Sequence, residues 1–504
     1  MAPALTPRRA AVAVGLVAAA AGALTLNRHL VGIFYDDGLY TGLAWALAHG
    51  RGYVYPNLPG TPAAVHYPPL YPLVLAPLFG LLSVPAAALA GKVLNVACAA
   101  AACGLIAWHA VRSELLGPGA PPWLAAAGVA ASALAIPFLA LLTVLFSEPL
   151  FALLLAAAVI LADRPPARWS PDAAAVLAGL AAALALLARS LGVAAGAGIV
   201  AWTYFAHRGT APRRMALAAL PLVLAGGAWG AWVLAHRHGI DPLLAPDYGS
   251  YFDIFRDAGP AVIVAGAADL ARPLGVLVLS LVPSRAVYYT CGIPALAVGL
   301  YGIGRLTRRS SIGLTLIVYL AILAAWPVPP DRFLWAILPW LALAWASGAA
   351  GLWRYTRLRA PLLALVAVLA FGYARYEIRG FAGRWWDTAA RQISDDFATL
   401  LPALDSLPPG AVIATDHDPL VWLYTRRSAV PLSIYGRQGN AVLEPPPAVH
   451  RAYLERQGVT HLIAGEGGGA AQQLQRLLDA YPGWLTAVHH WPGGRTLLEV
   501  RRER

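Results

Sequence analysis

Residues 33–40, Ile-Phe-Tyr-Asp-Asp-Gly-Leu-Tyr, place two adjacent carboxylates, Asp36 and Asp37, shortly after an apolar run from Ala10 to Leu26. The run is long enough to be an uncleaved membrane span, so the acidic pair is predicted to lie at a membrane edge. An ionisable residue at membrane depth is costly and usually has a function. Asp is also a favoured helix N-cap, so a structural role is compatible with the same position.

The composition assigns the chain to the membrane proteins. Of 504 residues, 59% are hydrophobic and only 12% are charged, which a soluble globule could not bury. The net charge of +12 is better explained by Arg-rich cytoplasmic loops than by nucleic-acid binding. The three cysteines all lie in apolar runs and form neither a disulfide framework nor a zinc-ligand spacing.

Length and flanking charge predict an all-α polytopic membrane domain of about eleven spans with its N-terminus inside. The predicted spans centre near Val17, Ala99, Ala131, Leu155, Ala181, Ala197, Leu224, Ala297, Ile317, Leu341 and Val366. This alternation puts every strongly basic short loop on the cytoplasmic side. These loops contain Arg112, Arg164, Arg168, Arg208, Arg213, Arg214, Arg305, Arg308, Arg309, Arg354, Arg357 and Arg359.

The number of predicted spans depends on treating Leu70–Leu82 as a half-inserted helix. A helix of this length is only about 20 Å long, which is too short to cross the roughly 30 Å hydrocarbon core. The first outer loop then covers residues 28–85 and contains the acidic pair. The membrane domain is predicted to span residues 1–375. Residues 376–504 are more polar, and their alternation of short apolar runs with a helical pattern predicts a small α/β domain on the same outer side.

Further candidates lie on the same predicted outer face. His66 and Tyr67, in the stretch Val65–Pro77, are candidate donors to an anionic group, although the prolines there also serve simply to start a helix. Glu148 in Phe-Ser-Glu-Pro-Leu-Phe is a candidate site carboxylate or an ordinary first-turn acid. Arg189 and Arg332 are candidate phosphate ligands or snorkelling side chains.

The segment Thr-Asp-His-Asp-Pro at 415–419 has residue types that bind metals. It fits a strand-to-helix turn better.

Four stretches in this order resemble the signatures of bacterial GT-C glycosyltransferases, the group related to the protein O-mannosyltransferases and the lipid A aminoarabinose transferases. They are YDDGLY at 35–40, HYPPLYPLVLAPL at 66–78, SEPLF at 147–151 and DRFLWAILPW at 331–340. The likeness covers residues 1 to about 375. Two positions depart from the family pattern: Asp37 replaces the commoner Glu, and His66 replaces the Lys of the aminoarabinose transferases.

The resemblance implies inverting transfer of a sugar from a polyprenyl-phosphate donor on the extracytoplasmic side of the bacterial inner membrane. Asp36 would be the base, Asp37 or Glu148 would orient the acceptor or Asp36, and Arg332, Arg189, His66 and Tyr67 would bind the phosphate. No metal is demanded, because the leaving group already carries its phosphate charge, although some relatives use a divalent ion. The partners are a lipid-linked sugar, membrane lipids and a glycan, lipid or protein acceptor.

Two other classes fit part of the pattern. A transporter or flippase of lipid-linked sugars would also have many spans and few buried charges, but such proteins typically show inverted repeats and charges at mid-membrane. A non-catalytic envelope assembly protein would not need acids and arginines converging on one face. Consumption of a polyprenyl-phosphate sugar distinguishes the enzyme from both.

Overall fold

The computed structural model describes residues 5–206, 211–251, 263, 266–267, 269–270, 284–326, 329–438, 441–465, 468–491 and 494–501. The chain divides into two units, each assembled from three separate segments. The first unit comprises Met1–Leu26, Lys92–Gly230 and Pro260–Thr388, and the second comprises Asn27–Gly91, Ala231–Gly259 and Ala389–Arg504. The second unit therefore combines the whole of the predicted first loop with most of the predicted C-terminal domain.

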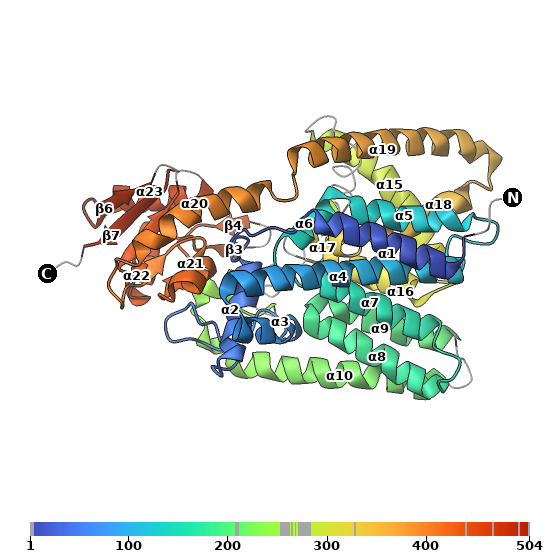
Figure 1. Ribbon diagram of the computed structural model, residues 1–504, viewed down its shortest axis with the longest axis horizontal. Coiled ribbons are helices and arrows are strands. Elements are labelled where there is room, and N and C mark those ends of the chain that lie inside the picture. Colours follow the sequence, from blue (N-terminus) through green and yellow to red (C-terminus); the bar gives the residue numbers. More distant parts are fainter. Residues whose placement is uncertain are drawn as a thin grey trace. The chain divides into compact units, whose positions relative to one another are not determined.

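The first unit is helical (Figure 1). Its described elements are α1 (Pro7–Ala23), most of α4 (Val84–Arg112), α5 (Pro122–Leu134), α6 (Ile136–Thr143), α7 (Glu148–Asp163), α8 (Pro171–Ala188), η1 (Ser190–Gly192), α9 (Val193–Ala206), most of α10 (Ala211–His236), α15 (Arg285–Leu306), α16 (Ser311–Ala324), α17 (Asp331–Ala336), α18 (Leu338–Leu352) and α19 (Thr356–Gly383).

Glycine lets α15 and α18 pack closely. A Cβ added at Gly302 would collide with the carbonyl oxygen of Ala344, and one added at Gly348 would collide with that of Val298. Small residues at such contacts are typical of helix pairs in membranes, where backbones gain packing by close approach.

A break separates α5 from α6, and the two helices meet at a bend of 52°. Ala135 there is extended, and the buried Glu377 of α19 accepts hydrogen bonds from the backbone N–H of Ile136 at 3.0 and 3.3 Å. A buried backbone donor released by a helix break needs such a partner. Glu377 thus stabilises the bend that leads to α7.

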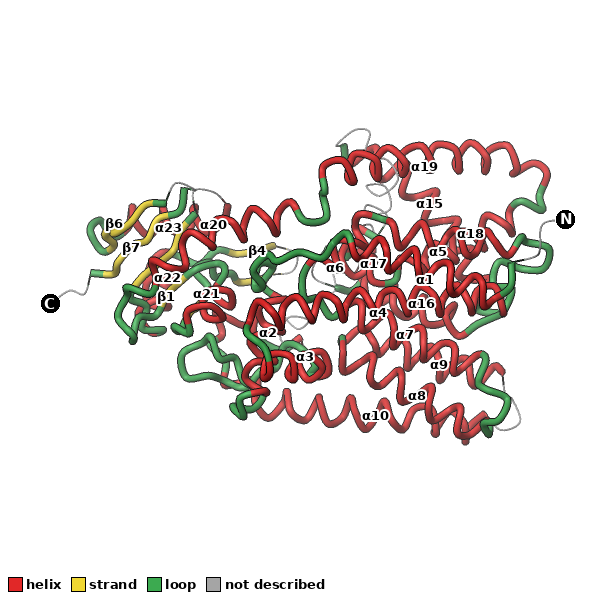
Figure 2. Tube along the Cα trace, viewed as in Figure 1, coloured by secondary structure: helices red, strands yellow, loops and turns green. Residues whose placement is uncertain are grey.

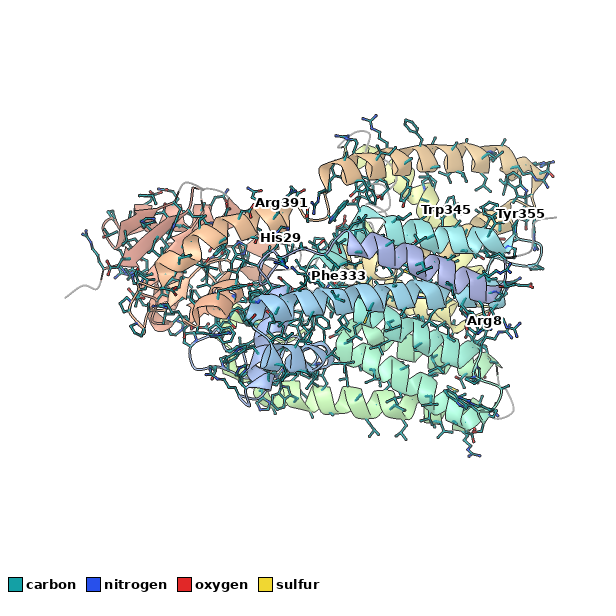
Figure 3. All side chains as sticks on the ribbon, viewed as in Figure 1. Arg8, His29, Phe333, Trp345, Tyr355 and Arg391 are labelled. Carbon is teal, nitrogen blue, oxygen red and sulfur yellow. The ribbon has the colours of Figure 1, made fainter. Side chains whose placement is uncertain are left out.

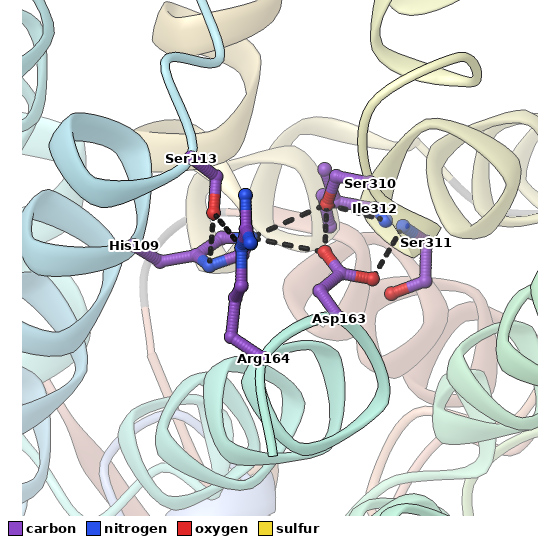
Figure 4. Close-up of polar contacts among 7 residues, drawn as sticks. All are labelled: His109, Ser113, Asp163, Arg164, Ser310, Ser311 and Ile312. Atoms are coloured by element: carbon purple, nitrogen blue, oxygen red, sulfur yellow. Dashed lines mark hydrogen bonds and ion pairs between the residues drawn. The ribbon is translucent and has the colours of Figure 1, made fainter. Parts of the chain in front are cut away.

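Several basic loops come together at one end of the first unit. Asp163 at the end of α7 contacts His109 of α4 at 3.0 Å and accepts from the N–H of Ser311 at 2.9 Å, as Figure 4 shows. Arg305 and Arg309 donate to the carbonyls of Leu116 and Glu114 at 3.2 and 3.3 Å.

Figure 3 places Arg8 and Tyr355 at one end of the helices of this unit and Phe333 at the opposite end. The arginine-bearing loops and the segment around Arg332 are therefore at different ends of the helical unit.

The second unit combines helices with a small sheet, drawn yellow in Figure 2. The strands of the sheet are β1 (Ile413–Ala414), β2 (Ala429–Val430), β5 (His461–Ala464), β6 (Leu485–His490) and β7 (Thr496–Val500), and β3 (Gly436–Gln438) and β4 (Ala441–Leu443) form a separate hairpin. The sheet order is β2-β1-β5-β7-β6, with β1 parallel to β2 and β5, and β7 antiparallel to β5 and β6.

The helices of the second unit include α2 (Asp36–Ala48), α3 (Leu70–Leu81), α11 (Ala245–Tyr248), α20 (Thr388–Leu404), α21 (Asp418–Thr425), α22 (Pro447–Arg456) and α23 (Gly468–Ala480), with η2 (Arg237–Gly239) and η3 (Pro242–Leu244). Gly38 of α2 lies against Pro419 and Gly32, where a Cβ would come within 2.6 Å of the proline Cβ. This close approach joins the first loop to the sheet-bearing part of the unit.

Each predicted span centre lies within a helix. Length and composition qualify four helices in the described part of the chain as membrane-crossing, or five if the bent pair α5 and α6 is one span. The remaining apolar helices are shorter, so the predicted number of about eleven spans and their orientation are not confirmed.

Candidate active site

In the first unit, one carboxylate lies between two arginines. Glu148 Oε1 is 2.9 Å from Arg189 Nη1 and 3.0 Å from Arg332 Nε. Glu148 is fully buried, whereas 27% of the Arg332 side chain is exposed. Counted over these three side chains the cluster carries a net positive charge, and Arg332 is its accessible part.

Local sequence brings these groups together. Glu148 begins α7 and Pro149 fills the first helical position, where a missing N–H does no harm. Arg189 follows the last residue of α8 with an extended backbone, and Arg332 lies in the first turn of α17, two residues after Pro330. Arg189 also donates to the Ser147 hydroxyl at 3.3 Å.

Aromatic rings fix the planes of both guanidinium groups. Arg332 lies 4.6 Å from the ring centroid of Phe146, and Arg189 lies 4.9 Å from that of Phe333. Arginine stacks in this way while its N–H groups remain directed in the plane toward acceptors. Guanidinium groups held in this way are chemically able to bind an oxyanion, and Glu148 contacts both of them.

In the second unit, the two adjacent acids have different environments. Asp37 is fully buried, and its carboxylate accepts from the backbone N–H groups of Gly32 at 2.7 Å, Ile33 at 3.3 Å and Phe34 at 2.8 Å. A carboxylate with three backbone donors caps the loop before its own helix. Asp37 therefore stabilises the loop that precedes α2. The expectation that an acid of this pair is the helix N-cap is wrong, because the N-cap position is Tyr35 and no side chain caps the helix.

Asp36 is partly exposed, and its Oδ1 accepts from the Tyr67 hydroxyl at 2.6 Å. Burial, together with the charge of Asp36, raises the pKa of Tyr67 well above its ordinary value, so the phenol keeps its proton and donates. The Tyr40 ring packs on Tyr67 at a centroid distance of 4.7 Å. These contacts orient the Asp36 carboxylate.

A strained turn precedes Asp36. Tyr35 has φ 63° and ψ −67°, and the N–H of Asp36 donates to the carbonyl of Phe34 at 2.6 Å. This is a γ-turn in its rare positive-φ form, which costs about 1–3 kcal/mol for a non-glycine residue. Such strain is concentrated at functional sites, and here it sets the direction in which Asp36 leaves the backbone.

His66 is buried and its Nδ1 is 2.7 Å from the carbonyl oxygen of Gly249. That contact assigns the proton to Nδ1, which leaves Nε2 as an acceptor in the neutral ring. Only the protonated imidazole could therefore donate to a phosphate through Nε2. The Tyr251 ring also packs against His66 at 4.5 Å, so the histidine ties the first loop to residues 249–251.

The segment 415–419 forms the turn between β1 and α21, as its sequence suggests. Asp418 within it is fully buried, and Asn57 donates to its Oδ2 at 2.8 Å while the Tyr248 hydroxyl donates to the same oxygen. Burial raises the pKa of Asp418 well above its ordinary value. No pattern in the sequence indicates this network, because its three members are far apart along the chain.

His417 gives the second unit a pH-dependent stability. Burial, reinforced by the Arg495 charge, lowers the pKa of His417 from 6.5 to about 4. Between those values the unfolded chain binds a proton that the folded unit does not, so stability falls as the pH is lowered through this window, by about 3 kcal/mol. We expect His417→Gln to flatten the pH dependence of the apparent melting temperature.

His489→Gln is the matched control, because His489 is exposed. A His417→Gln curve parallel to the wild type between pH 6.5 and 4 would contradict this account. Burial also lowers the pKa values of His450 and His461, which act in the same direction.

Among the described residues, no three His, Cys, Asp or Glu side chains gather closely enough to hold a metal ion. The sequence-based expectation that no metal is required stays a prediction.

No protein-family model matches the chain, and no curated protein matches its sequence. Solved structures do match. ArnT from Cupriavidus metallidurans in the apo state aligns over 97% of both chains, at 15% identity and a TM-score of 0.55. An Archaeoglobus fulgidus oligosaccharyltransferase in complex with Zn and sulfate aligns over 97% of this chain and 73% of its own, at 14% identity and a TM-score of 0.56.

A third match is the archaeal oligosaccharyltransferase AglB from Archaeoglobus fulgidus, bound to an inhibitory peptide and a dolichol-phosphate. It covers 90% of this chain and 69% of its own, at 12% identity and a TM-score of 0.52. These proteins are GT-C fold glycosyltransferases, and the present chain has the GT-C fold.

Proposed function

We propose that the protein is a glycosyltransferase that moves a sugar from a polyprenyl-phosphate donor to a hydroxyl of an envelope glycan, lipid or protein. The reaction takes place on the extracytoplasmic side of the bacterial inner membrane. The observation that carries the proposal is the difference between the two adjacent acids. The carboxylate of Asp37 accepts hydrogen bonds from backbone N–H groups, whereas Asp36 is partly exposed and accepts a hydrogen bond from the Tyr67 hydroxyl. A carboxylate held in this way is suited to act as a general base.

The cationic cluster supports a phosphate-bearing donor. Arg332 is partly exposed, and Glu148 contacts both Arg332 and the buried Arg189. In our proposal both guanidinium groups donate to oxygens of the donor phosphate. The protonated form of His66 is proposed to assist from the first loop.

An apolar cavity lies on one side of α17 in the first unit. Leu334 of α17 lines this cavity of about 600 Å³, and most of its other lining residues belong to α5, α15, α18 and α19. Its lining includes Ala131, Gly299, Leu338 and Val366. We assign it to the isoprenoid chain of the donor, because its lining is apolar and a lipid chain needs an apolar space.

The proposed reaction is a single displacement at the anomeric carbon. Asp36 takes the proton of the acceptor hydroxyl as its oxygen forms the new bond to carbon. The bond from that carbon to the phosphate oxygen breaks, and its electron pair leaves with the polyprenyl phosphate. The arginines stabilise the additional negative charge on the leaving phosphate.

The experiment is to give the detergent-purified protein a panel of radiolabelled polyprenyl-phosphate sugars. Release of polyprenyl phosphate, by transfer or by slow hydrolysis, is expected for one of them. If the protein remains folded and every donor of the panel stays intact, the proposed function is refuted.

Arg332→Ala is expected to weaken binding of undecaprenyl phosphate about tenfold or more, because it removes the accessible cation of the cluster. Binding to the purified protein by tryptophan fluorescence or calorimetry checks this. Arg359→Ala, which removes an exposed arginine stacked on Trp353 at 5.5 Å, is the control and should leave affinity unchanged. Equal affinities in all three proteins would refute the role of Arg332.

A further inference from the structure

Three side chains meet where the three chain segments of the second unit come together. Asn57 belongs to the first segment, Tyr248 to the second and Asp418 to the third. Asn57 Nδ2 donates to Asp418 Oδ2 at 2.8 Å and also to the Tyr248 hydroxyl, which itself donates to Asp418 Oδ2. All three residues are buried. Because buried polar groups are costly unless they are hydrogen-bonded, these contacts hold each side chain in one orientation.

The ring of Tyr248 lies against the residue that precedes Asp36. The ring centroids of Tyr248 and Tyr35 are 5.6 Å apart in an edge-to-face contact. Tyr35 has the positive φ of 63°, so its backbone sets the direction in which Asp36 leaves the chain. A non-glycine residue keeps such a strained conformation only where its surroundings hold it. The Tyr248 ring is one of these supports.

Tyr248 also supports the residue that donates to Asp36. The Tyr55 ring packs edge-to-face on the Tyr248 ring at 4.8 Å, and the Tyr55 hydroxyl donates to the carbonyl oxygen of Tyr248 at 3.2 Å. The backbone N–H of His66 donates in turn to the Tyr55 hydroxyl at 3.1 Å. His66 is followed by Tyr67, whose hydroxyl donates to Asp36 Oδ1 at 2.6 Å. Two separate routes therefore lead from Tyr248 to Asp36, one through the backbone before it and one through its hydrogen-bond donor.

We propose that Tyr248, fixed by Asn57 and Asp418, is a positioning residue that sets the direction of the Asp36 carboxylate. The inference rests on the proposed function, in which Asp36 takes the proton of the acceptor hydroxyl. Tyr248 acts on the reaction through the neighbours of Asp36 and not through the substrate. A displacement of about 1 Å at a reacting group can cost about a hundredfold in rate, so a small shift of the carboxylate is measurable in turnover.

Tyr248→Phe tests the proposal, because it removes the hydroxyl and keeps the ring. We expect kcat to fall about tenfold or more with the polyprenyl-phosphate sugar that the radiolabelled panel identifies, because the ring loses the hydrogen bonds that fix it. The affinity for undecaprenyl phosphate should stay at the wild-type value, since the arginines proposed to bind the phosphate belong to the first unit. Wild-type kcat in Tyr248→Phe would overturn the proposal.

Tyr453→Phe is the matched control. Tyr453 lies in α22 of the same unit, is fully buried and donates through its hydroxyl to the carbonyl oxygen of Pro431 at 2.9 Å. Loss of a buried hydrogen bond should lower the melting temperature of both variants, whereas only Tyr248→Phe should lower kcat. Equal losses of kcat in the two variants would overturn the proposal, since a general loosening of the unit would then explain them.

The route through Asp36 is tested by combining substitutions. If Tyr248 acts only by orienting the Asp36 carboxylate, Tyr248→Phe should lower turnover no further in an Asp36→Asn background. An additional tenfold loss in the double variant would overturn the proposal, because the Tyr248 hydroxyl would then act on another step.

The part played by Asp418 is tested with two substitutions. Asp418→Asn keeps an oxygen that can accept from Tyr248 and Asn57, so it should retain most of the wild-type kcat. Asp418→Ala removes this acceptor and should lower kcat as Tyr248→Phe does. Equal kcat values in folded samples of the two Asp418 variants would overturn the assignment of Asp418 as the group that fixes Tyr248.

The two proposals fail separately. If the wild-type protein consumes a donor and Tyr248→Phe consumes it at the same rate, Tyr248 is excluded and the glycosyltransferase proposal stands. If the wild-type protein consumes no donor, the proposed function fails, and the role of Tyr248 fails with it.

Discussion

Asp36→Asn is expected to reduce sugar transfer about a hundred- to ten-thousandfold, the contribution that a positioned general base makes to a proton transfer. The amide nearly matches the carboxylate in shape and can still accept from the Tyr67 hydroxyl, which lies 2.6 Å from Asp36 Oδ1. The fold and the donor affinity should therefore be preserved. Turnover of a polyprenyl-phosphate sugar by the purified variant, with a melting curve recorded on the same sample, measures both.

Asp37→Asn is the matched comparison, since it makes the same chemical change at the next residue. Asp37 holds three backbone N–H groups, so this variant should lose about 1–3 kcal/mol of stability. The molecules that remain folded should keep most of their activity. Wild-type turnover by Asp36→Asn would exclude Asp36 as the base. So would a loss of activity in Asp37→Asn together with a loss of stability alone in Asp36→Asn.

Glu148→Ala is expected to destabilise the first unit by about 3 kcal/mol or more. The substitution removes the carboxylate that contacts Arg189 and Arg332, and it leaves Arg189, whose side chain is only 8% exposed, without its charge partner. Removing one partner of a buried pair is far more harmful than replacing both. Thermal unfolding of the purified protein checks the expectation.

Asp172→Ala is the control for that measurement. Asp172 contacts Arg213 at 2.8 Å in a pair whose arginine is 77% exposed, and such surface pairs contribute about 0–1 kcal/mol. Equal melting temperatures for the Glu148 and Asp172 variants would show that the buried cluster is not a stabilising element. Restoration of stability by Glu148→Ala combined with Arg189→Met would support the charge argument, because it removes the stranded guanidinium.

Hydrophobic pattern alone places the helices, because apolar runs of this length have few alternatives, and each predicted centre lies within one. The short runs at 411–415, 460–465 and 496–500 contain β1, β5 and β7. The number of helices that cross the membrane is harder to predict from the sequence, because several apolar helices are shorter than a full span. Whether such a short helix crosses the membrane depends on the helices packed around it, and the local sequence does not specify those neighbours.

The grouping of Glu148 with Arg189 and Arg332 is predictable from orientation, because all three lie at helix ends that the charge pattern assigns to one face. The individual roles are not. Asp36 and Asp37 are chemically identical neighbours, and only the path of residues 32–34 determines that Asp37 serves the backbone. The Asn57, Tyr248 and Asp418 network is equally hidden, since long-range hydrogen bonds leave no periodic signal.

The second unit draws on the first loop and on the last stretch of the chain, and Gly32 packs so tightly on Leu420 that a Cβ would lie 2.7 Å from its Cα. Because a ribosome makes the N-terminal part first, the loop that holds Asp36 must wait for nearly the whole polypeptide before it finds its packing partner. A prematurely terminated chain would thus lack Leu420, the residue on which the loop of Asp36 packs, and we expect that loop to remain unformed in it.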